Sequence, residues 1–535
     1  MKLRPPSGQH ALLSTGTMAS FLLACSLLAV AQGASAPSFA TLFHGGAVLQ
    51  RDAEASVWGT VKGGGAVTLY LDGSRAAKAT VKASGKWTAT LPKRPPSFGS
   101  VLTAVGSAGN SSVKVNFGDV LLCSGQSNMG MPVANKPGAF QADNGTAEAA
   151  AAGRYAGGIW LWSQPQARFH VPTAWTAASS TALSRSFSAV CWYTGKGHFE
   201  RLGGSVPVGL FAVAVGGSPI EYWLSKESLA KCETDVPRCD TQLPDSSFYD
   251  DQITSLLPYT IGAIIWDQAE RDLKCNHVAK YPCMQRELVR SWREAFRSPA
   301  APFVAVQLPD YYDPMDPGAG HVPGFATSAE GLLAMRLAQE SSLDGVEKAA
   351  LVATYDQSCN NLAFPDHCPF GSVHNIHKQV IGMRVAAQLA HLMRGEDVVV
   401  EGPRAQTATA AAVGNGTGFS VTIRFAGGSA PFALQPTRNC TDCCRGSFGA
   451  KAKGDFDASP DGTSWAMGSN ARMQGKDSVV FHVGGSAPPA FVRYTGGSNF
   501  TQCAVYNKEA LPALPFQIKV QKSIEVQNEL STILV

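Results

Sequence analysis

Four segments of the chain carry the side chains and backbone groups that an acyl-transfer reaction needs. Each segment directly follows a run of apolar residues that predicts a buried strand. Ligands of an open parallel sheet bind outside the carboxyl ends of its strands, so we expect the four segments to meet at one sheet edge. In chain order they are Ser124–Met129 (SGQSNM), Gly216–Pro219, Asp267–Glu270, and a loop with His374 and His377.

Within these segments, Ser127 is the candidate nucleophile and His374 the candidate base. A serine hydroxyl is a poor nucleophile at its own pKa, so a neighbouring histidine must take its proton. The oxyanion of the tetrahedral intermediate needs N–H donors that are already aimed at it. The expected donors are the Ser127 N–H, a backbone N–H from Gly216-Gly217 and the side-chain amide of Gln268.

Each of these residues also has an ordinary structural interpretation. Ser127 can simply cap a helix, and Gly216-Gly217 can be a tight turn. Gln268 can satisfy buried backbone groups, and His374 can be a hydrogen-bonding loop residue. Their convergence on one sheet edge favours a site. The site is not the G-x-S-x-G elbow of the α/β-hydrolases, because Met129 stands at the last glycine.

The two histidines of the last loop are not equivalent. We expect a helix from Ile376, so that His374 precedes it and His377 falls in its first turn. A side chain in that turn is directed by the helix rather than by the site. The positive end of the helix also disfavours a protonated His377. The sequence therefore favours His374 as the base and predicts that His377 is dispensable.

Strands and helices alternate between these segments, which predicts an α/β domain with a doubly wound parallel sheet. Apolar runs of five to seven residues indicate strands that are buried on both faces. They lie at 119–123, 211–215, 261–266, 302–308 and 350–356, and helical patterns cover 283–298, 328–342 and 376–393.

Short strand patterns between Gly-rich and Pro-rich turns flank this α/β region on both sides. We therefore predict four parts, with β-rich domains on either side of the catalytic one. They are a signal peptide at 1–36, a β-sandwich at 37–117, a catalytic α/β domain at 118–398 and a β-rich module at 399–535.

The N-terminus has the pattern of a secretory signal peptide. Lys2 and Arg4 precede an apolar run at 18–31, and small residues follow, with cleavage expected after Gly33 or Ala36. A membrane anchor is the alternative, but the run is shorter than the roughly 20 residues that a span needs. We expect a mature protein without a stable membrane span, in the secretory pathway and then in lysosomes or outside the cell.

Twelve cysteines remain after Cys25 leaves with the leader, an even number that favours disulfides in an oxidising compartment. Three pairs are close enough in sequence to close small loops: Cys232/Cys239, Cys275/Cys283 and Cys359/Cys368. Cys440, Cys443, Cys444 and Cys503 form a late cluster, for which a zinc site is the weaker alternative because no histidine accompanies it. Glycosylation sequons at Asn110, Asn144, Asn415, Asn439 and Asn499 agree with secretion.

Composition excludes several classes of protein. Hydrophobic residues make up 45% of the 535 residues and charged residues 16%, which excludes a disordered chain, a coiled coil or a collagen-like fibre. The formal net charge of +4 gives no reason to expect a nucleic acid or an anionic membrane as a partner.

Five stretches resemble the sialate O-acetylesterase family of the SGNH hydrolase superfamily. GDVLLCSGQSNM at 118–129 resembles its nucleophile block, and 208–223 and 368–390 resemble its second and histidine blocks. AVLQRDAEASVWG at 47–59 and SGKWTATLP at 84–92 resemble its N-terminal β-domain. The resemblance covers roughly residues 42–395.

This resemblance implies serine esterase chemistry on O-acetylated carbohydrates, typically 9-O-acetylated sialic acid, in lysosomes or outside the cell. Related members deacetylate plant cell-wall sugars. It assigns Ser127 as nucleophile, His374 as base, and Gly217 and Gln268 as oxyanion donors. No cofactor and no metal are expected, because these groups already supply nucleophile, base and oxyanion stabilisation.

The chain departs from the family pattern in three places. The third block usually reads Trp-Tyr-Gln-Gly-Glu-Ser and here reads WDQAER at 266–271. Asn375 replaces the usual proline after the histidine, and His377 stands at a position that is usually acidic. The aspartate that many members place two or three residues before the histidine is absent. Its role falls to Asp356 or Asp366, or the site is a dyad supported by a backbone carbonyl.

These departures keep a second hypothesis open beside a carbohydrate O-acetylesterase. It is a carbohydrate-binding protein of the same fold with impaired catalysis, motivated by the altered third block. A lipase or peptidase is the third and weakest hypothesis, because the sequence has neither a lid-like apolar segment nor another hydrolase motif.

Overall fold

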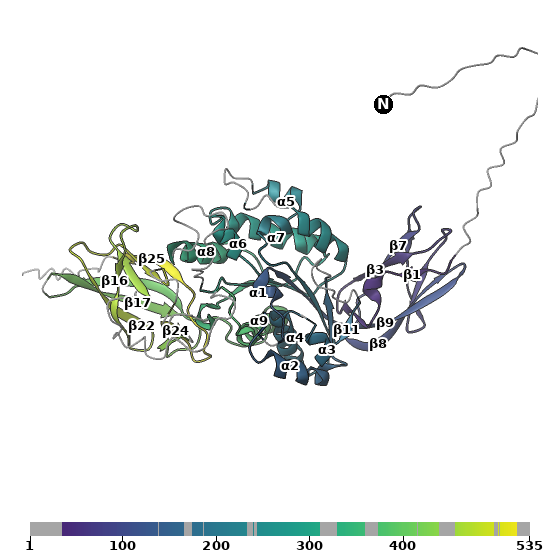
Figure 1. Ribbon diagram of the computed structural model, residues 1–535, viewed down its shortest axis with the longest axis horizontal. Coiled ribbons are helices and arrows are strands. Elements are labelled where there is room, and N and C mark those ends of the chain that lie inside the picture. Colours follow the sequence, from purple (N-terminus) through teal and green to yellow (C-terminus); the bar gives the residue numbers. More distant parts are fainter. Residues whose placement is uncertain are drawn as a thin grey trace, which may run out of the picture.

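The structure, a computed structural model, places three β-rich or mixed parts in a row (Figure 1). Strands from the N-terminal residues lie at one end, the helices surround a central sheet, and the C-terminal strands lie at the other end. Of the predicted leader at 1–36, only residues 35 and 36 belong to the described part of the chain. The structure describes residues 35–136, 138–164, 174–185, 187–232, 239, 243–310, 329–358, 373–414, 416–437, 455–496, 501 and 503–521.

Six parallel strands form the central sheet, and they include all five strands predicted from apolar runs. The sixth, β10, was missed, although its sequence IWLWS is apolar and aromatic. Antiparallel β11 (Thr176–Ala177) lies beside it at the edge. Across the sheet the order is β10 (Ile159–Ser163), β12 (Val208–Ala214), β9 (Gly109–Gly125), β13 (Ala263–Asp267), β14 (Phe303–Val306) and β15 (Ala349–Val352).

The strand order reverses its direction at β9. From β9 the chain builds β10 and β12 on one side and then crosses to build β13, β14 and β15 on the other. Connections that leave in opposite directions open a crevice at the carboxyl end of the strand between them. In this sheet that position is the carboxyl end of β9, at Gly125, two residues before Ser127.

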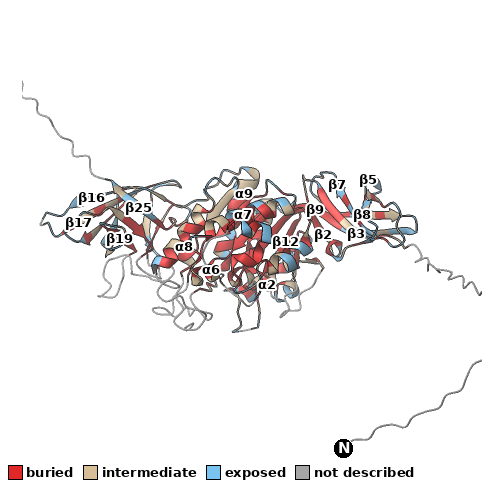
Figure 2. Ribbon diagram, turned by 90° about the horizontal axis from the view of Figure 1, so that it is seen from above, coloured by how far each residue is buried: buried red, intermediate tan, exposed pale blue. Residues whose placement is uncertain are grey.

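Helices cover both faces of the central sheet (Figure 1). One hydrophobic cluster joins one sheet face to α7 and α8, and a second joins the other face to α4 and α9. Figure 2 shows that the buried residues concentrate in this central region. The helices are α1 (Ser127–Gly130), α2 (Gly145–Ala151), α3 (Ser180–Leu183), α4 (Ala189–Arg201), α5 (Lys226–Ala230), α6 (Glu270–Lys274), α7 (Tyr281–Ala295), α8 (Ala329–Ser341) and α9 (Lys378–Arg394).

Helices α4 and α9 pack closely because glycines line their contact. A Cβ added at Gly382 would lie 2.5 Å from the Tyr193 Cβ, and one at Gly197 would lie 2.9 Å from the Ala386 Cβ. Gly195 and Gly197, both within α4, also explain why the sequence did not reveal this helix, since interior glycine disfavours a helix. The three predicted helices are all present, but α9 begins at Lys378, two residues later than expected.

The N-terminal strands form two sheets with a common core, and β9 connects that part to the central sheet. One sheet has the order β1-β3-β7-β6, and the other joins β5, β4, β8, β9 and β2. β9 is 17 residues long, and the predicted boundary at 117/118 lies within it. Asp119 on β9 accepts hydrogen bonds from Arg51 and pairs with His198 of α4. The strand bounds are β1 (Ser38–Phe39), β2 (Ala47–Gln50), β3 (Ala55–Thr60), β4 (Thr68–Leu71), β5 (Ser74–Lys78), β6 (Thr80–Val81), β7 (Lys86–Leu91) and β8 (Ser97–Gly106).

The C-terminal strands form an eight-stranded sheet and a two-stranded sheet around a core of their own. The order is β20-β19-β23-β25-β16-β17-β22-β21, with β18 paired to β24. Tyr355, just after β15, enters this core and donates a hydrogen bond to the Ala513 carbonyl at 2.6 Å. The strands are β16 (Arg404–Ala412), β17 (Gly418–Ala426), β18 (Ala433–Pro436), β19 (Phe456–Ser459), β20 (Ala466–Met467), β21 (Ser469–Gln474), β22 (Ser478–Gly484), β23 (Phe491–Tyr494), β24 (Cys503–Tyr506) and β25 (Phe516–Gln521).

Disulfide bonds are present, but two of the pairs that are close in sequence do not form. Between described cysteines the bonds are Cys123–Cys191, Cys232–Cys283 and Cys239–Cys275. Proximity in sequence suggested 232/239 and 275/283, whereas the fold brings one segment against the other and pairs the cysteines across them. The predicted pair Cys359/Cys368 lies outside the described residues. In the described part of the chain, no helix combines the length and apolar character required to cross a membrane.

Candidate active site

Ser127 stands where β9 turns into α1. The turn requires glycine at 125, whose φ is +142° and where a Cβ would lie 2.1 Å from the Asp267 carbonyl oxygen. Ser127 is the first residue of α1, so its N–H has no acceptor within the helix. The sharp turn therefore presents both the hydroxyl and the N–H of Ser127 at the carboxyl end of the sheet.

His374 lies beside this serine, as predicted. The His374 Nε2 and Ser127 Oγ are 2.8 Å apart, a hydrogen-bond distance between residues that are 247 positions apart in sequence. The edge of one ring meets the face of the other between Phe140 and His374, with ring centroids 5.1 Å apart. The histidine is thus oriented from two sides toward the hydroxyl.

His377 lies in a different environment, with Asp143 as its partner. It is the residue before α9 rather than part of its first turn, which corrects the predicted helix start. Its Nδ1 lies 2.7 Å from the Asp143 Oδ2, and its side chain is buried. His377 therefore holds the segment before α2 against the start of α9.

The glycine turn after β12 supplies the second candidate oxyanion donor. Gly217 has a φ of +71°, a conformation that favours glycine, and a Cβ added at Gly216 would lie 3.5 Å from the Ser127 Cβ. Among the described residues, no acceptor is found for the N–H of Ser127 or of Gly217. The two N–H groups thus belong to adjacent turns on either side of the nucleophile.

Gln268 lies behind these turns. Its side chain is buried, and its amide nitrogen donates to the Ser218 carbonyl at 3.0 Å and to Asp272. The Gln268 carbonyl oxygen accepts from Tyr281 at 3.0 Å. In this arrangement Gln268 fixes the turn that contains Gly217, and its role as a direct oxyanion donor stays a prediction.

Asp356 and Asp366 are the two carboxylates that the sequence offered as partners of His374. Asp356 is buried and accepts two hydrogen bonds from Arg384, at 2.8 and 2.7 Å, and one from Tyr506. It thereby joins the end of β15 to α9 and to the C-terminal strands. Asp366 lies outside the described residues. Whether an acidic side chain or a backbone carbonyl supports the His374 imidazole therefore stays an open alternative.

A buried polar cluster beneath Ser127 was not found from the sequence. It contains Asn128, Asp267, Glu270 and Lys378, each at most 4% exposed. Burial raises the pKa of Asp267 to about 7, an effect that Lys378 reduces and Glu270 increases. Burial also raises the pKa of Glu270 and lowers that of Lys378 to about 8. The cluster joins three segments that are distant in sequence, so no local pattern predicts it. The only sequence feature that pointed to it was the altered third block.

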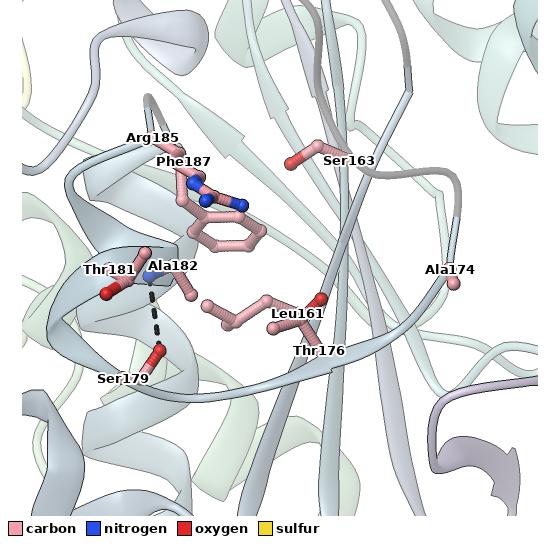
Figure 3. A pocket seen from close by; sticks show the side chains of 9 residues that line it. All are labelled: Leu161, Ser163, Ala174, Thr176, Ser179, Thr181, Ala182, Arg185 and Phe187. Carbon is pink, nitrogen blue, oxygen red and sulfur yellow. Dashed lines mark hydrogen bonds between the residues drawn. The ribbon is translucent and has the colours of Figure 1, made fainter.

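A hollow of about 460 Å³, open to solvent, lies at the carboxyl end of β10 (Figure 3). Arg185 is exposed there and forms no ion pair within the described part of the chain. The Phe187 carbonyl accepts from the Val133 N–H, which joins the wall of the hollow to the segment that follows Ser127. The lining residues are Leu161, Ser163, Ala174, Thr176, Ser179, Thr181, Ala182, Arg185 and Phe187.

The structure gives no candidate metal centre in the part of the chain that it describes, where no three His, Cys, Asp or Glu side chains cluster as metal ligands would. Of the late cysteine cluster, Cys503 is disulfide-bonded, so its sulfur is not a zinc ligand. Cys440, Cys443 and Cys444 lie outside the described residues.

Comparisons with known proteins indicate the family of this chain. The family described as "Carbohydrate esterase, sialic acid-specific acetylesterase" matches residues 117–322. The sialate O-acetylesterase of Pongo abelii is 30% identical over 401 residues, covering 68% of this chain and 73% of the relative. That of Homo sapiens is 29% identical with the same coverage. A crystal structure of a carbohydrate acetylesterase from Xanthomonas citri has a TM-score of 0.68 and 26% identity, over 90% of this chain and 99% of that one.

The matched range contains Ser127, Gly217 and Gln268, and His374 lies outside it. The solved structure extends the likeness to nearly the whole chain, including the flanking β-rich parts. The chain belongs to the sialate O-acetylesterase family and is an esterase of the hydrolase class.

Proposed function

We propose that the protein removes O-acetyl groups from sugars through an acetyl-enzyme formed on Ser127. The observation that carries this proposal is the 2.8 Å contact between the His374 Nε2 and the Ser127 Oγ at the carboxyl edge of the parallel sheet. A nucleophile within hydrogen-bond reach of its base is the signature of nucleophilic catalysis. The strand order, with helices on both faces, supports the doubly wound arrangement of the SGNH hydrolases.

The reaction proceeds in two halves. In the first, the Ser127 oxygen attacks the acetyl carbon while His374 Nε2 takes the hydroxyl proton. The resulting oxyanion accepts hydrogen bonds from the N–H groups of Ser127 and Gly217. Collapse of the intermediate breaks the bond to the sugar oxygen, which receives the proton from His374. In the second half, His374 takes a proton from water, the hydroxide attacks the acetyl carbon, and acetate leaves as Ser127 regains its proton.

We propose that the sugar is acidic, as O-acetylated sialic acids are. The support is the hollow at the carboxyl end of β10, where Arg185, which forms no ion pair within the described part of the chain, lines the same space as Ser163, Thr176 and Thr181 (Figure 3). A guanidinium matches the geometry of a carboxylate, and hydroxyls suit the polar rim of a sugar.

The three predicted parts after the leader remain our proposal for the domain organisation, with a catalytic domain at 118–398 between β-rich domains. The three disulfides support folding in the secretory pathway, and a lysosome or the extracellular space is the proposed destination. The alternative of an impaired carbohydrate-binding protein is less favoured, because serine and histidine are already in contact.

Product analysis with a panel of acetylated sugars tests this function. The panel should include O-acetylated sialic acids and acetylated xylan, assayed with wild-type protein and Ser127→Ala. We expect acetate release from the sialic acids by the wild type alone. Binding of the sugars without acetate release would instead establish the carbohydrate-binding alternative.

A further inference from the structure

Asn128 connects the neighbours of both catalytic residues. It follows Ser127 directly, and its side chain is 1% exposed. The Asn128 amide nitrogen donates to the Val373 carbonyl at 2.8 Å, and Val373 directly precedes His374. The same nitrogen also donates to Glu270. One buried amide therefore ties the nucleophile helix to the histidine loop.

Lys378 completes this connection from the other side. Its ammonium donates to the Asn128 Oδ1 at 2.6 Å and to the Asn375 Oδ1 at 2.9 Å. Asn375 directly follows His374, so the histidine is anchored through both of its chain neighbours. Lys378 is itself 1% exposed, at the first position of α9.

The charge of Lys378 makes these contacts directional. Hydrogen bonds from an ammonium are stronger than those between neutral groups. They fix the Asn128 amide with its oxygen toward Lys378 and its nitrogen toward Glu270 and the Val373 carbonyl. If the Asn128 amide were reversed, its N–H groups would face the Lys378 ammonium and its oxygen would face the Val373 carbonyl.

The carboxylates that face the ammonium come from two other elements. Asp267 ends β13 and Glu270 begins α6, and both interact electrostatically with Lys378. Neither forms an ion pair within 4 Å of the ammonium among the described residues. The cation therefore remains available to the two asparagine oxygens, and the carboxylates offset the cost of burying it.

We propose that Lys378 and Asn128 are positioning residues that clamp the Ser127 turn to the His374 loop and so set the distance between nucleophile and base. This inference rests on the proposed serine mechanism. A displacement of about 1 Å at reacting groups can cost roughly 100-fold in rate, so loss of the clamp acts mainly on kcat.

The test compares two buried lysines in the full chain. Lys378→Met removes the ammonium but keeps a chain of similar length. Lys196→Met is the matched control, because Lys196 is also buried and paired, here with Glu148 at 2.8 Å, away from the site. Hydrolysis of p-nitrophenyl acetate gives kcat and KM, and urea unfolding gives the stability of each variant. Ser127→Ala is assayed in parallel.

We expect Lys378→Met to lower kcat about 100-fold with KM within about twofold, and Lys196→Met to keep kcat within about twofold. Equal losses of kcat in both variants, or an unchanged kcat in Lys378→Met, would overturn the clamp. If Lys378→Met does not fold, Asn375→Ala decides: a kcat loss of about fivefold or more at constant KM supports the clamp, and a smaller loss refutes it. An active Ser127→Ala would refute the proposed function instead.

Discussion

Substitution of Asp267 tests how much the buried cluster beneath Ser127 lowers the free energy of unfolding. Its carboxylate lies at the end of β13, it is 3% exposed, and its Oδ2 has no hydrogen-bond partner among the described residues. A buried carboxylate without such a partner is costly when ionised. Asp267→Asn keeps the shape of the side chain and removes the charge.

The magnitude follows from the pKa of Asp267, which burial raises from 3.8 to about 7. Because the pKa is higher in the folded state, the favourable contribution is fully present below pH 3.8 and is lost as the pH rises through 7. The rise from 3.8 to about 7, at about 1.36 kcal/mol per pKa unit, gives a loss of up to about 4 kcal/mol at pH 8. The asparagine variant does not suffer this loss.

Urea unfolding of wild type and Asp267→Asn, at pH 4 and at pH 8 with disulfides intact, measures the effect. We expect similar free energies of unfolding at pH 4 and a more stable variant at pH 8. Asp397→Asn, at an exposed position, is the control and should show no such pH dependence. The reasoning is refuted if Asp267→Asn is destabilised at pH 8 relative to pH 4.

Four further predictions concern the site. Ser127→Ala should lose at least about 1,000-fold in p-nitrophenyl acetate hydrolysis with an unchanged urea midpoint, and retention of a tenth of the activity would remove Ser127 from the mechanism. His374→Ala should lose nearly as much activity as Ser127→Ala, and the double variant should be hardly worse than either single variant. His377→Ala should stay active. An inactive His377→Ala beside an active His374→Ala would identify His377 as the base. Arg185→Gln should raise KM roughly tenfold for an O-acetylated sialic acid and leave acetylated xylan unaffected, so an equal effect on both would contradict carboxylate recognition. Activity should survive EDTA, since the serine mechanism gives a Lewis acid no role, and its return with added zinc after loss would disprove this.

Local patterns were sufficient for five of the six parallel strands and for placing Ser127 and His374 at one sheet edge. A strand buried on both faces must be apolar throughout, so β9, β12 and β13 were visible as runs. Because the ends of parallel strands share one edge, Ser127 and His374 could be placed together from their positions after such runs. The mixed α/β architecture and the esterase activity followed from the same segments.

Features that depend on contacts between distant segments could not be predicted. Asn128 meets Lys378 across 250 positions, and no local periodicity signals such a contact. The pairing of Cys232 with Cys283 likewise depends on how the segment after α5 meets the start of α7 rather than on the spacing of the two cysteines. Helix α4 was hidden for a different reason, because the glycines that let it pack on α9 lower its intrinsic helix propensity.

The length of β9 has a consequence for how the molecule unfolds. Its 17 residues span about 55 Å, long enough to hydrogen-bond within the N-terminal sheet and the central sheet at once. Asp119, held by Arg51 and by His198, stands where the two sheets meet. Melting the N-terminal strands would therefore strip the partners from the amino-terminal half of β9, the strand whose other end presents Ser127. These two parts should behave as a single cooperative unit in hydrogen exchange, and the N-terminal strands should not be removable without loss of the esterase fold.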